Sequence, residues 1–169
     1  MTEEMTEWIH DLYKLFEKEV RLYKELLEIE ISKTDAINKI EGKLLETLTK
    51  KSYELSITAS ILEKARMDAI NDIYKKNHME KPQSVTLSDF LNNIDRKSNY
   101  KLKGITNSLK ETVHNLKSRI IVNEKLVKSR QELFQFTINS IQEAASENEV
   151  YSATGKKSKS KPVMLNMQV

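Results

Sequence analysis

Apolar residues recur at intervals of three and four along almost the whole chain, and this spacing limits the possible folds more than any other feature. The first run consists of Trp8, Leu12, Leu15, Leu22, Leu26 and Ile29. Such spacing places apolar side chains on one side of an α-helix. Only three Gly and two Pro occur in 169 residues, which leaves little material for turns. We therefore expect an all-α protein made of a few long helices.

Interruptions of this pattern predict where the helices end. Ser32 to Asp35 resembles a helix-capping sequence, Pro82 breaks a helix, and Thr86 to Asp89 resembles a capping box. The predicted helices cover residues 3–32, 35–76, 87–94 and 100–146. Lys97-Ser98-Asn99 belongs to a polar link before the last helix. Three long helices and one short helix predict an antiparallel bundle. At about 1.5 Å per residue the longest helices exceed roughly 60 Å, so we expect an elongated bundle.

The charge distribution separates a body from a tail. Lysines 156, 157, 159 and 161 lie in a segment without acids and contribute +4, so the rest of the chain carries about −1 of the net charge of +3. The near-neutral body has no electrostatic signature of a nucleic-acid-binding protein. We expect a helical domain over residues 1–148 and a flexible, disordered basic tail over residues 149–169.

The same composition bears on cellular location. The chain has no cysteine, its first residues are acidic, and no apolar stretch reaches the roughly 18 residues of a membrane span. We expect a cytoplasmic protein without stable membrane insertion.

Two Glu-x-x-His elements, Glu7/His10 and Glu111/His114, raise the alternative of a di-iron carboxylate protein. Metal ligands in such bundles point inward. Counting about 100° per residue places both pairs well away from the apolar side of their helices. His78 has no neighbour that suggests catalysis. We therefore expect no metal, no cofactor and no enzymatic activity.

The last predicted helix carries two apolar stripes. The first stripe consists of Ile120, Val127, Phe134, Ile138 and Ile141, and the second stripe, on the far side, of Val122, Leu126, Leu133 and Phe136. An antiparallel trio of helices needs one stripe per helix. We expect the first stripe to lie in the bundle and the second to bind a partner helix. The alternative is a sandwiched helix in which both stripes are core.

Three short motifs resemble a known family, the FlgN-like flagellar export chaperones, which serve the hook-associated proteins of the hook–filament junction. The motifs are Thr34-Asp35-Ala36-Ile37 with Lys43-Leu44-Leu45, Asn123-x-x-Leu126-Val127, and Tyr151-x-x-x-Gly155. Ile120 stands where the family tends to have asparagine, and Ser152 replaces the first glycine of the tail motif. The former weakens the match in the last helix, and the latter bears on how the tyrosine is presented.

The resemblance implies a cytoplasmic chaperone of type III flagellar export. Its last helix would bind the C-terminal helical segments of hook-associated proteins and prevent their premature assembly. Tyr151 and Gly155 would dock the loaded chaperone on the cytoplasmic domain of the export-gate membrane protein. The candidate client-binding residues are Val122, Asn123, Leu126, Ser129, Leu133 and Phe136.

A second reading of the same stripes remains open. A coiled-coil adaptor or self-associating structural protein would use the second stripe for homodimerisation. The sequence does not distinguish a monomer from a homodimer.

Overall fold

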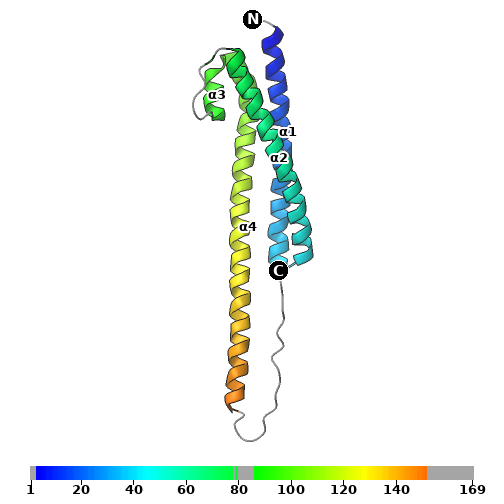
Figure 1. The fold of residues 1–169 in the computed structure, drawn as a ribbon, viewed down its shortest axis with the longest axis vertical. Helices are drawn as coiled ribbons and strands as arrows, with labels where there is room; N and C mark the ends of the chain where they lie inside the picture. The colour runs from blue at the N-terminus through cyan, green and yellow to red at the C-terminus, as the bar shows by residue number, and fades with distance from the viewer. Residues whose placement is uncertain (1–2, 78, 80–85, 152–169) are drawn as a thin grey trace. The chain divides into compact units, whose positions relative to one another are not determined.

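The computed structural model describes residues 3–77, 79 and 86–151, with side chains described from Glu7 to Ser146. These residues form four helices and no strand: α1 (Glu3–Lys39), α2 (Gly42–Lys76), α3 (Leu87–Asn93) and α4 (Arg96–Tyr151) (Figure 1). The prediction of an all-α bundle with three long helices and one short helix is confirmed. The predicted disordered tail lies outside the described residues from residue 152 onward.

The chain divides into two compact units, one ending at Val127 and the other beginning at Lys128. The division falls within α4. In the first unit, α1 and α2 run antiparallel, and the early part of α4 runs in the direction of α1 (Figure 1). This unit contains the hydrophobic core.

The connection between α1 and α2 lies later than the sequence predicted. The predicted break at Ser32 to Asp35 is wrong, because these residues are helical. Ser32 Oγ donates to the carbonyl oxygen of Glu28 at 3.0 Å, and Thr34 Oγ1 lies 3.0 Å from the carbonyl oxygen of Glu30. Hydroxyl groups that bond to the preceding turn are accommodated within a helix. Their presence alone therefore does not indicate a cap.

The actual turn is centred on Ile40, whose φ of 60° is left-handed. Ile40 N–H donates to Ile37 O at 3.3 Å, and Glu41 N–H donates to Ala36 O at 2.9 Å. This pair of bonds is the Schellman ending of a helix, which normally places glycine at the left-handed position. A β-branched residue there carries backbone strain. Because isoleucine occupies the position where glycine is usual, the helix end could not be recognised from the sequence.

The core of the first unit consists of two apolar clusters. The larger cluster joins α1, α2, α3 and α4 and includes Phe16, Ile70, Tyr74, Phe90 and Leu102. Trp8 and Tyr74 both meet the ring of Phe90 edge-on, at centroid distances of 6.5 and 6.0 Å. The smaller cluster joins Leu26 of α1, Ala59 of α2 and Leu116 of α4. Burial of the side chains in these two clusters holds the early part of α4 against α1 and α2.

The predicted capping box at the start of α3 is confirmed. Thr86 Oγ1 accepts from Asp89 N–H at 3.1 Å, and Thr86 N–H donates to Asp89 Oδ2 at 3.1 Å. The predicted polar link over residues 97–99 is wrong, because α4 already begins at Arg96. Asp95 Oδ1 accepts from the N–H groups of Lys97 and Ser98 at 3.0 and 3.1 Å. Asp95 is thus the N-terminal cap that the prediction missed.

None of the described helices combines the length and apolar character that a membrane crossing requires.

Candidate protein-binding surface

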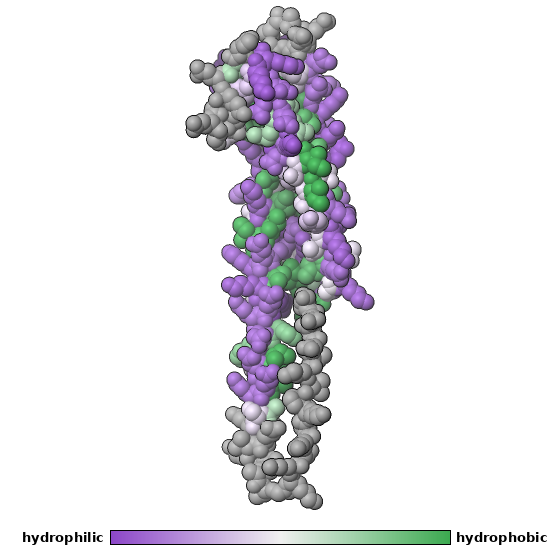
Figure 2. All heavy atoms as spheres, viewed as in Figure 1, coloured by the Kyte–Doolittle hydropathy of each residue, from purple (hydrophilic) through white to green (hydrophobic). Residues whose placement is uncertain are grey.

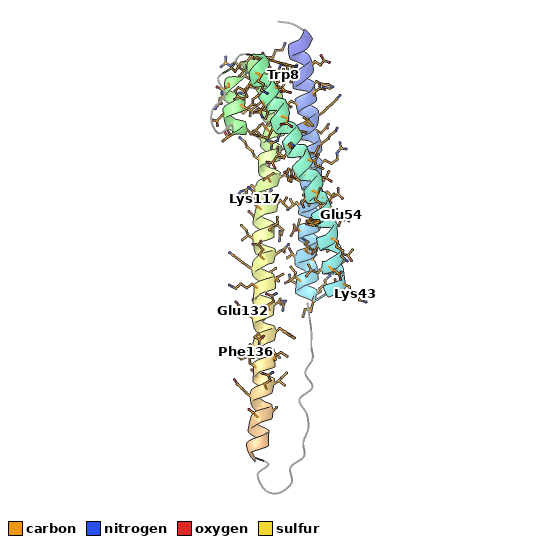
Figure 3. All side chains as sticks on the ribbon, in the orientation of Figure 1. Trp8, Lys43, Glu54, Lys117, Glu132 and Phe136 are labelled. Atoms are coloured by element: carbon orange, nitrogen blue, oxygen red, sulfur yellow. The ribbon has the colours of Figure 1, made fainter. Side chains whose placement is uncertain are left out.

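The part of α4 that follows Lys128 exposes most of its large apolar side chains. Leu133 is 55% exposed, Phe134 61%, Phe136 70% and Ile141 60%, and Ile138 is half-buried. We call these five residues the apolar face. Green apolar side chains reach the surface of α4 between hydrophilic ones in Figure 2, and Phe136 is labelled in Figure 3. Concentrated exposure of this kind marks an interaction site more often than a free surface.

Around this stretch of helix the large apolar side chains all lie on one side, together with Ser129, Arg130, Thr137 and Ser140, and the other side is entirely polar. At about 100° per residue, the apolar face covers an arc of about 200° from Phe136 to Ile138. The remaining arc holds Lys128, Gln131, Glu132, Gln135, Asn139, Gln142 and Glu143. Within the apolar arc, Arg130 is the one charged residue. The helix is therefore amphipathic, although most of its large apolar side chains are not covered by the part of the chain that the structure describes.

The bundle-facing pattern of α4 ends before this stretch. Leu102, Leu109, Leu116 and Asn123 follow one another at intervals of seven, and all four are buried. The next two positions of this series are Arg130 and Thr137. A polar residue at each of these positions gives the bundle no apolar contact to continue.

The prediction that the first stripe belongs to the bundle is therefore wrong for Phe134 and Ile141, which are exposed. Their exposure also excludes the sandwiched arrangement for this stretch, because both stripes would then be buried. The sequence signal that could have shown this was the polar pair Arg130 and Thr137, which interrupts the buried series. Phe134 and Ile141 are thus surface residues that the sequence analysis assigned to the core.

The predicted client-binding residues occupy different environments. Leu133 and Phe136 lie in the apolar face, and Ser129 is exposed. Val122 is 42% exposed and Leu126 is half-buried, both within the first unit. Asn123 is only 6% exposed.

Asn123 connects α4 to α1 through its side-chain amide. Asn123 Nδ2 donates to the carbonyl oxygen of Glu30 and to Glu30 Oε2, both at 2.8 Å. Thr34 Oγ1 donates to Asn123 Oδ1 at 2.7 Å. The motifs that contain Thr34 and Asn123 are 89 residues apart in sequence and meet here. With its amide fully used, Asn123 is a bundle residue and is not available to a client.

The carboxylate of Glu30 completes this cluster. Lys33 Nζ lies 2.6 Å from Glu30 Oε1, and Ser52 Oγ of α2 donates to the same oxygen at 3.2 Å. Glu30 is thus linked to α2 and, through Asn123, to α4. We call Glu30, Lys33, Thr34, Ser52 and Asn123 the polar cluster. A buried carboxylate that is fully hydrogen-bonded fixes the register of the helices that supply its partners.

A second buried acid, Glu19, is less well matched. Arg66 Nε of α2 donates to Glu19 Oε1 at 3.1 Å and lies 2.9 Å from Oε2. Oε2 has no well-aligned donor among the described residues. Burial raises the pKa of Glu19, and the nearby guanidinium of Arg66 lowers that pKa by less. Folding therefore makes the charged form of Glu19 less favourable than it is in the unfolded chain.

The two Glu-x-x-His elements face solvent. Glu7, His10, Glu111 and His114 are all exposed. Within the described residues, no group of three or more His, Cys, Asp or Glu side chains is arranged to hold a metal ion. The exposed positions oppose the di-iron alternative, because such ligands must point into the bundle.

The predicted docking residues lie at the limit of the described chain. Tyr151 is the last residue of α4, which extends five residues beyond the predicted end at Ser146. The side chain of Tyr151 and all of Gly155 lie outside the described residues. Their role in docking stays a prediction.

Comparison with known proteins gives one match. A model of one protein family, described as FlgN protein, matches residues 1–159. No curated protein and no solved structure matches the chain.

Proposed function

Because the chain belongs to the FlgN family of flagellar export chaperones, we propose that it is a cytoplasmic chaperone for hook-associated proteins. It binds their C-terminal helical segments, prevents premature assembly and delivers them to the export gate. The activity is binding alone and involves no cofactor or chemical step.

The apolar face of α4 is the observation that carries this proposal. Leu133, Phe134 and Phe136 are each more than half exposed in a helix whose opposite side is entirely polar. A partner that covers them gains about 25 cal/mol for each Å² of apolar surface removed from water. An amphipathic helix is the natural partner, because its apolar side chains interleave with those of a second helix.

The same surface explains how binding prevents assembly. If a client segment assembles through its own apolar side, that side is covered while the segment lies on α4. The core and the polar cluster of the first unit hold the early part of α4 against α1 and α2. Ser129, exposed between Phe136 and Leu133 around the helix, can hydrogen-bond to a client side chain.

Isothermal titration tests the proposal with C-terminal segments of the hook-associated proteins of the same organism. We expect each wild-type chain to bind one C-terminal client region and Leu133→Glu/Phe136→Glu to lose that binding. Gln135→Glu/Gln142→Glu is the matched control, because it places the same residue type on the polar side of the same helix. Wild-type protein that binds no hook-associated segment would refute the proposal.

Delivery requires a second surface, and we propose that Tyr151 and Gly155 supply it. Tyrosine offers apolar area and a hydroxyl with little loss of rotamer entropy, which suits a transient contact. Tyr151→Ala should keep client affinity unchanged and weaken capture by the cytoplasmic domain of the export-gate protein. Equal loss of client binding in Tyr151→Ala and Leu133→Glu/Phe136→Glu would contradict two separate surfaces.

The alternative is an adaptor in which the apolar faces of two copies pair with each other. Sedimentation equilibrium distinguishes the two proposals. A stable dimer that Leu133→Glu/Phe136→Glu converts to monomers, together with no client binding, supports the adaptor.

A further inference from the structure

The apolar face is wider than a single partner helix requires. Helices that pack on one neighbour usually present a stripe about 100° wide, whereas this face spans about 200°. Leu133 and Phe136, from the second stripe, occupy one edge of the face. Phe134, Ile138 and Ile141, from the first stripe, occupy the other. The centres of the two groups are about 135° apart at about 100° per residue.

A polar seam separates these two edges. Arg130 and Thr137 fall between them, with Ala144 as the one small apolar residue on the seam. A helix centred on the seam would face Arg130 and Thr137 and would leave both groups of large apolar side chains at its margins. The geometry therefore favours two partners, one on each edge.

We propose that the apolar face holds two helical segments of one client at the same time, one on each stripe. This inference rests on the proposed function and adds Phe134, Ile138 and Ile141 to the client-binding residues.

The spacing also specifies the connection between the two client segments. Two helices packed at 8–10 Å from α4 in directions about 135° apart lie roughly 17 Å from each other. They straddle α4 and do not form a tight pair. An extended chain covers about 3.3 Å per residue, so the segments need a connection of about five residues or more. The suitable client is therefore a C-terminal region with two amphipathic helices and a short linker.

Titration with three client peptides tests this arrangement: the full C-terminal region and each of its two helical halves. Leu133→Glu/Phe136→Glu and Phe134→Glu/Ile141→Glu should each weaken binding of the full region by about thirtyfold or more, the effect of losing a central apolar contact. Each half should bind more weakly than the full region and respond to only one of the two double variants. Gln135→Glu/Gln142→Glu should bind all three peptides as the wild type does.

The outcomes separate this inference from the proposed function. If the wild-type chain binds the full region and Phe134→Glu/Ile141→Glu binds it equally well, the two-segment arrangement is wrong and the chaperone proposal stands. If both halves respond to the same double variant, the arrangement is also wrong. If the wild-type chain binds no client peptide and forms a dimer that Phe134→Glu/Ile141→Glu disrupts, a second copy occupies the face and both proposals fail.

Discussion

The two parts of α4 carry the same kind of amphipathic pattern and use it differently. Up to Val127, Leu109, Leu116 and Asn123 are buried against α1 and α2. After Lys128, large apolar side chains such as Leu133 and Phe136 are exposed. Periodicity therefore identifies a helix and its apolar side, but it does not say whether that side meets its own chain or another protein.

The largest expected contrast compares one substitution in each part. Leu109→Ala should lower the free energy of unfolding by about 3 kcal/mol, because it leaves a cavity in the larger apolar cluster. Leu133→Ala should change that free energy by less than about 0.5 kcal/mol, because the side chain is exposed. Urea denaturation followed by circular dichroism measures both.

Client affinity should show the reverse order. Leu133→Ala should weaken client binding about tenfold, and Leu109→Ala should leave it unchanged under conditions where that variant is folded. A stability loss in Leu133→Ala as large as that of Leu109→Ala would show that the apolar face is part of the folded core.

The polar cluster offers the next test, because it anchors α4 just before the exposed stretch. Asn123→Ala removes two hydrogen bonds to Glu30 and should cost about 2 kcal/mol of unfolding free energy. Asn115→Ala, at an exposed position of the same helix, is the control and should be nearly neutral. If Asn123→Ala retains stability and loses direct client contact, Asn123 belongs to the binding surface after all.

The pH dependence of stability tests whether Arg66 compensates incompletely for the burial of the Glu19 carboxylate in the first unit. A carboxyl whose pKa is raised by folding stabilises the folded state fully below its ordinary value of 4.5 and loses that contribution as pH rises through the raised pKa. The wild-type unfolding free energy should therefore fall, relative to that of Glu19→Gln, as pH rises from 4 upward.

Urea titrations at several pH values measure this difference. Glu17→Gln, at an exposed site on α1, should show no comparable difference from the wild type. A Glu19→Gln curve parallel to the wild type would mean that Arg66 compensates fully for the burial of Glu19.

The smallest expected effect concerns the turn between α1 and α2. Ile40→Gly should raise the unfolding free energy by about 1 kcal/mol, because glycine adopts a left-handed φ without steric cost. Ile31→Gly, within regular helix, should lower it by a few tenths of a kcal/mol. Thermal melts of both variants give the sign, and a loss of stability in Ile40→Gly would contradict strain at Ile40.

Much of the fold could be predicted from the sequence, because its signals are local. Apolar spacing indicated the three long helices, and the capping box of Thr86 and Asp89 identified the start of α3. The turn at Ile40 could not be predicted, because a β-branched residue occupies a position that normally requires glycine. The helix break predicted at Ser32 to Asp35 was wrong for a different reason. The hydroxyl groups of Ser32 and Thr34 contact carbonyl oxygens of the preceding turn, so these residues lie within α1 and do not end it.

The candidate site was predictable only in part. Leu133 and Phe136 were proposed because they belong to a second apolar stripe, whereas a helix in this bundle needs only one, and both are exposed. Asn123 was predicted to be available to a client and is buried, whereas Phe134 was predicted to be buried and is exposed. Both environments depend on where α4 stops contacting the other helices. The point where these contacts end is set by pairs of side chains far apart in sequence, such as Glu30 and Asn123. The spacing of residues within one helix therefore cannot predict it.

Hydrogen exchange measured with and without the bound C-terminal region of a hook-associated protein tests the division of α4 most directly. We expect client binding to increase protection of backbone amides within residues 128–146 and to leave the buried residues of α1 and α2 unchanged. Protection that appears on α1 and α2 while residues 128–146 exchange as before would place the client elsewhere and contradict the assignment of the apolar face.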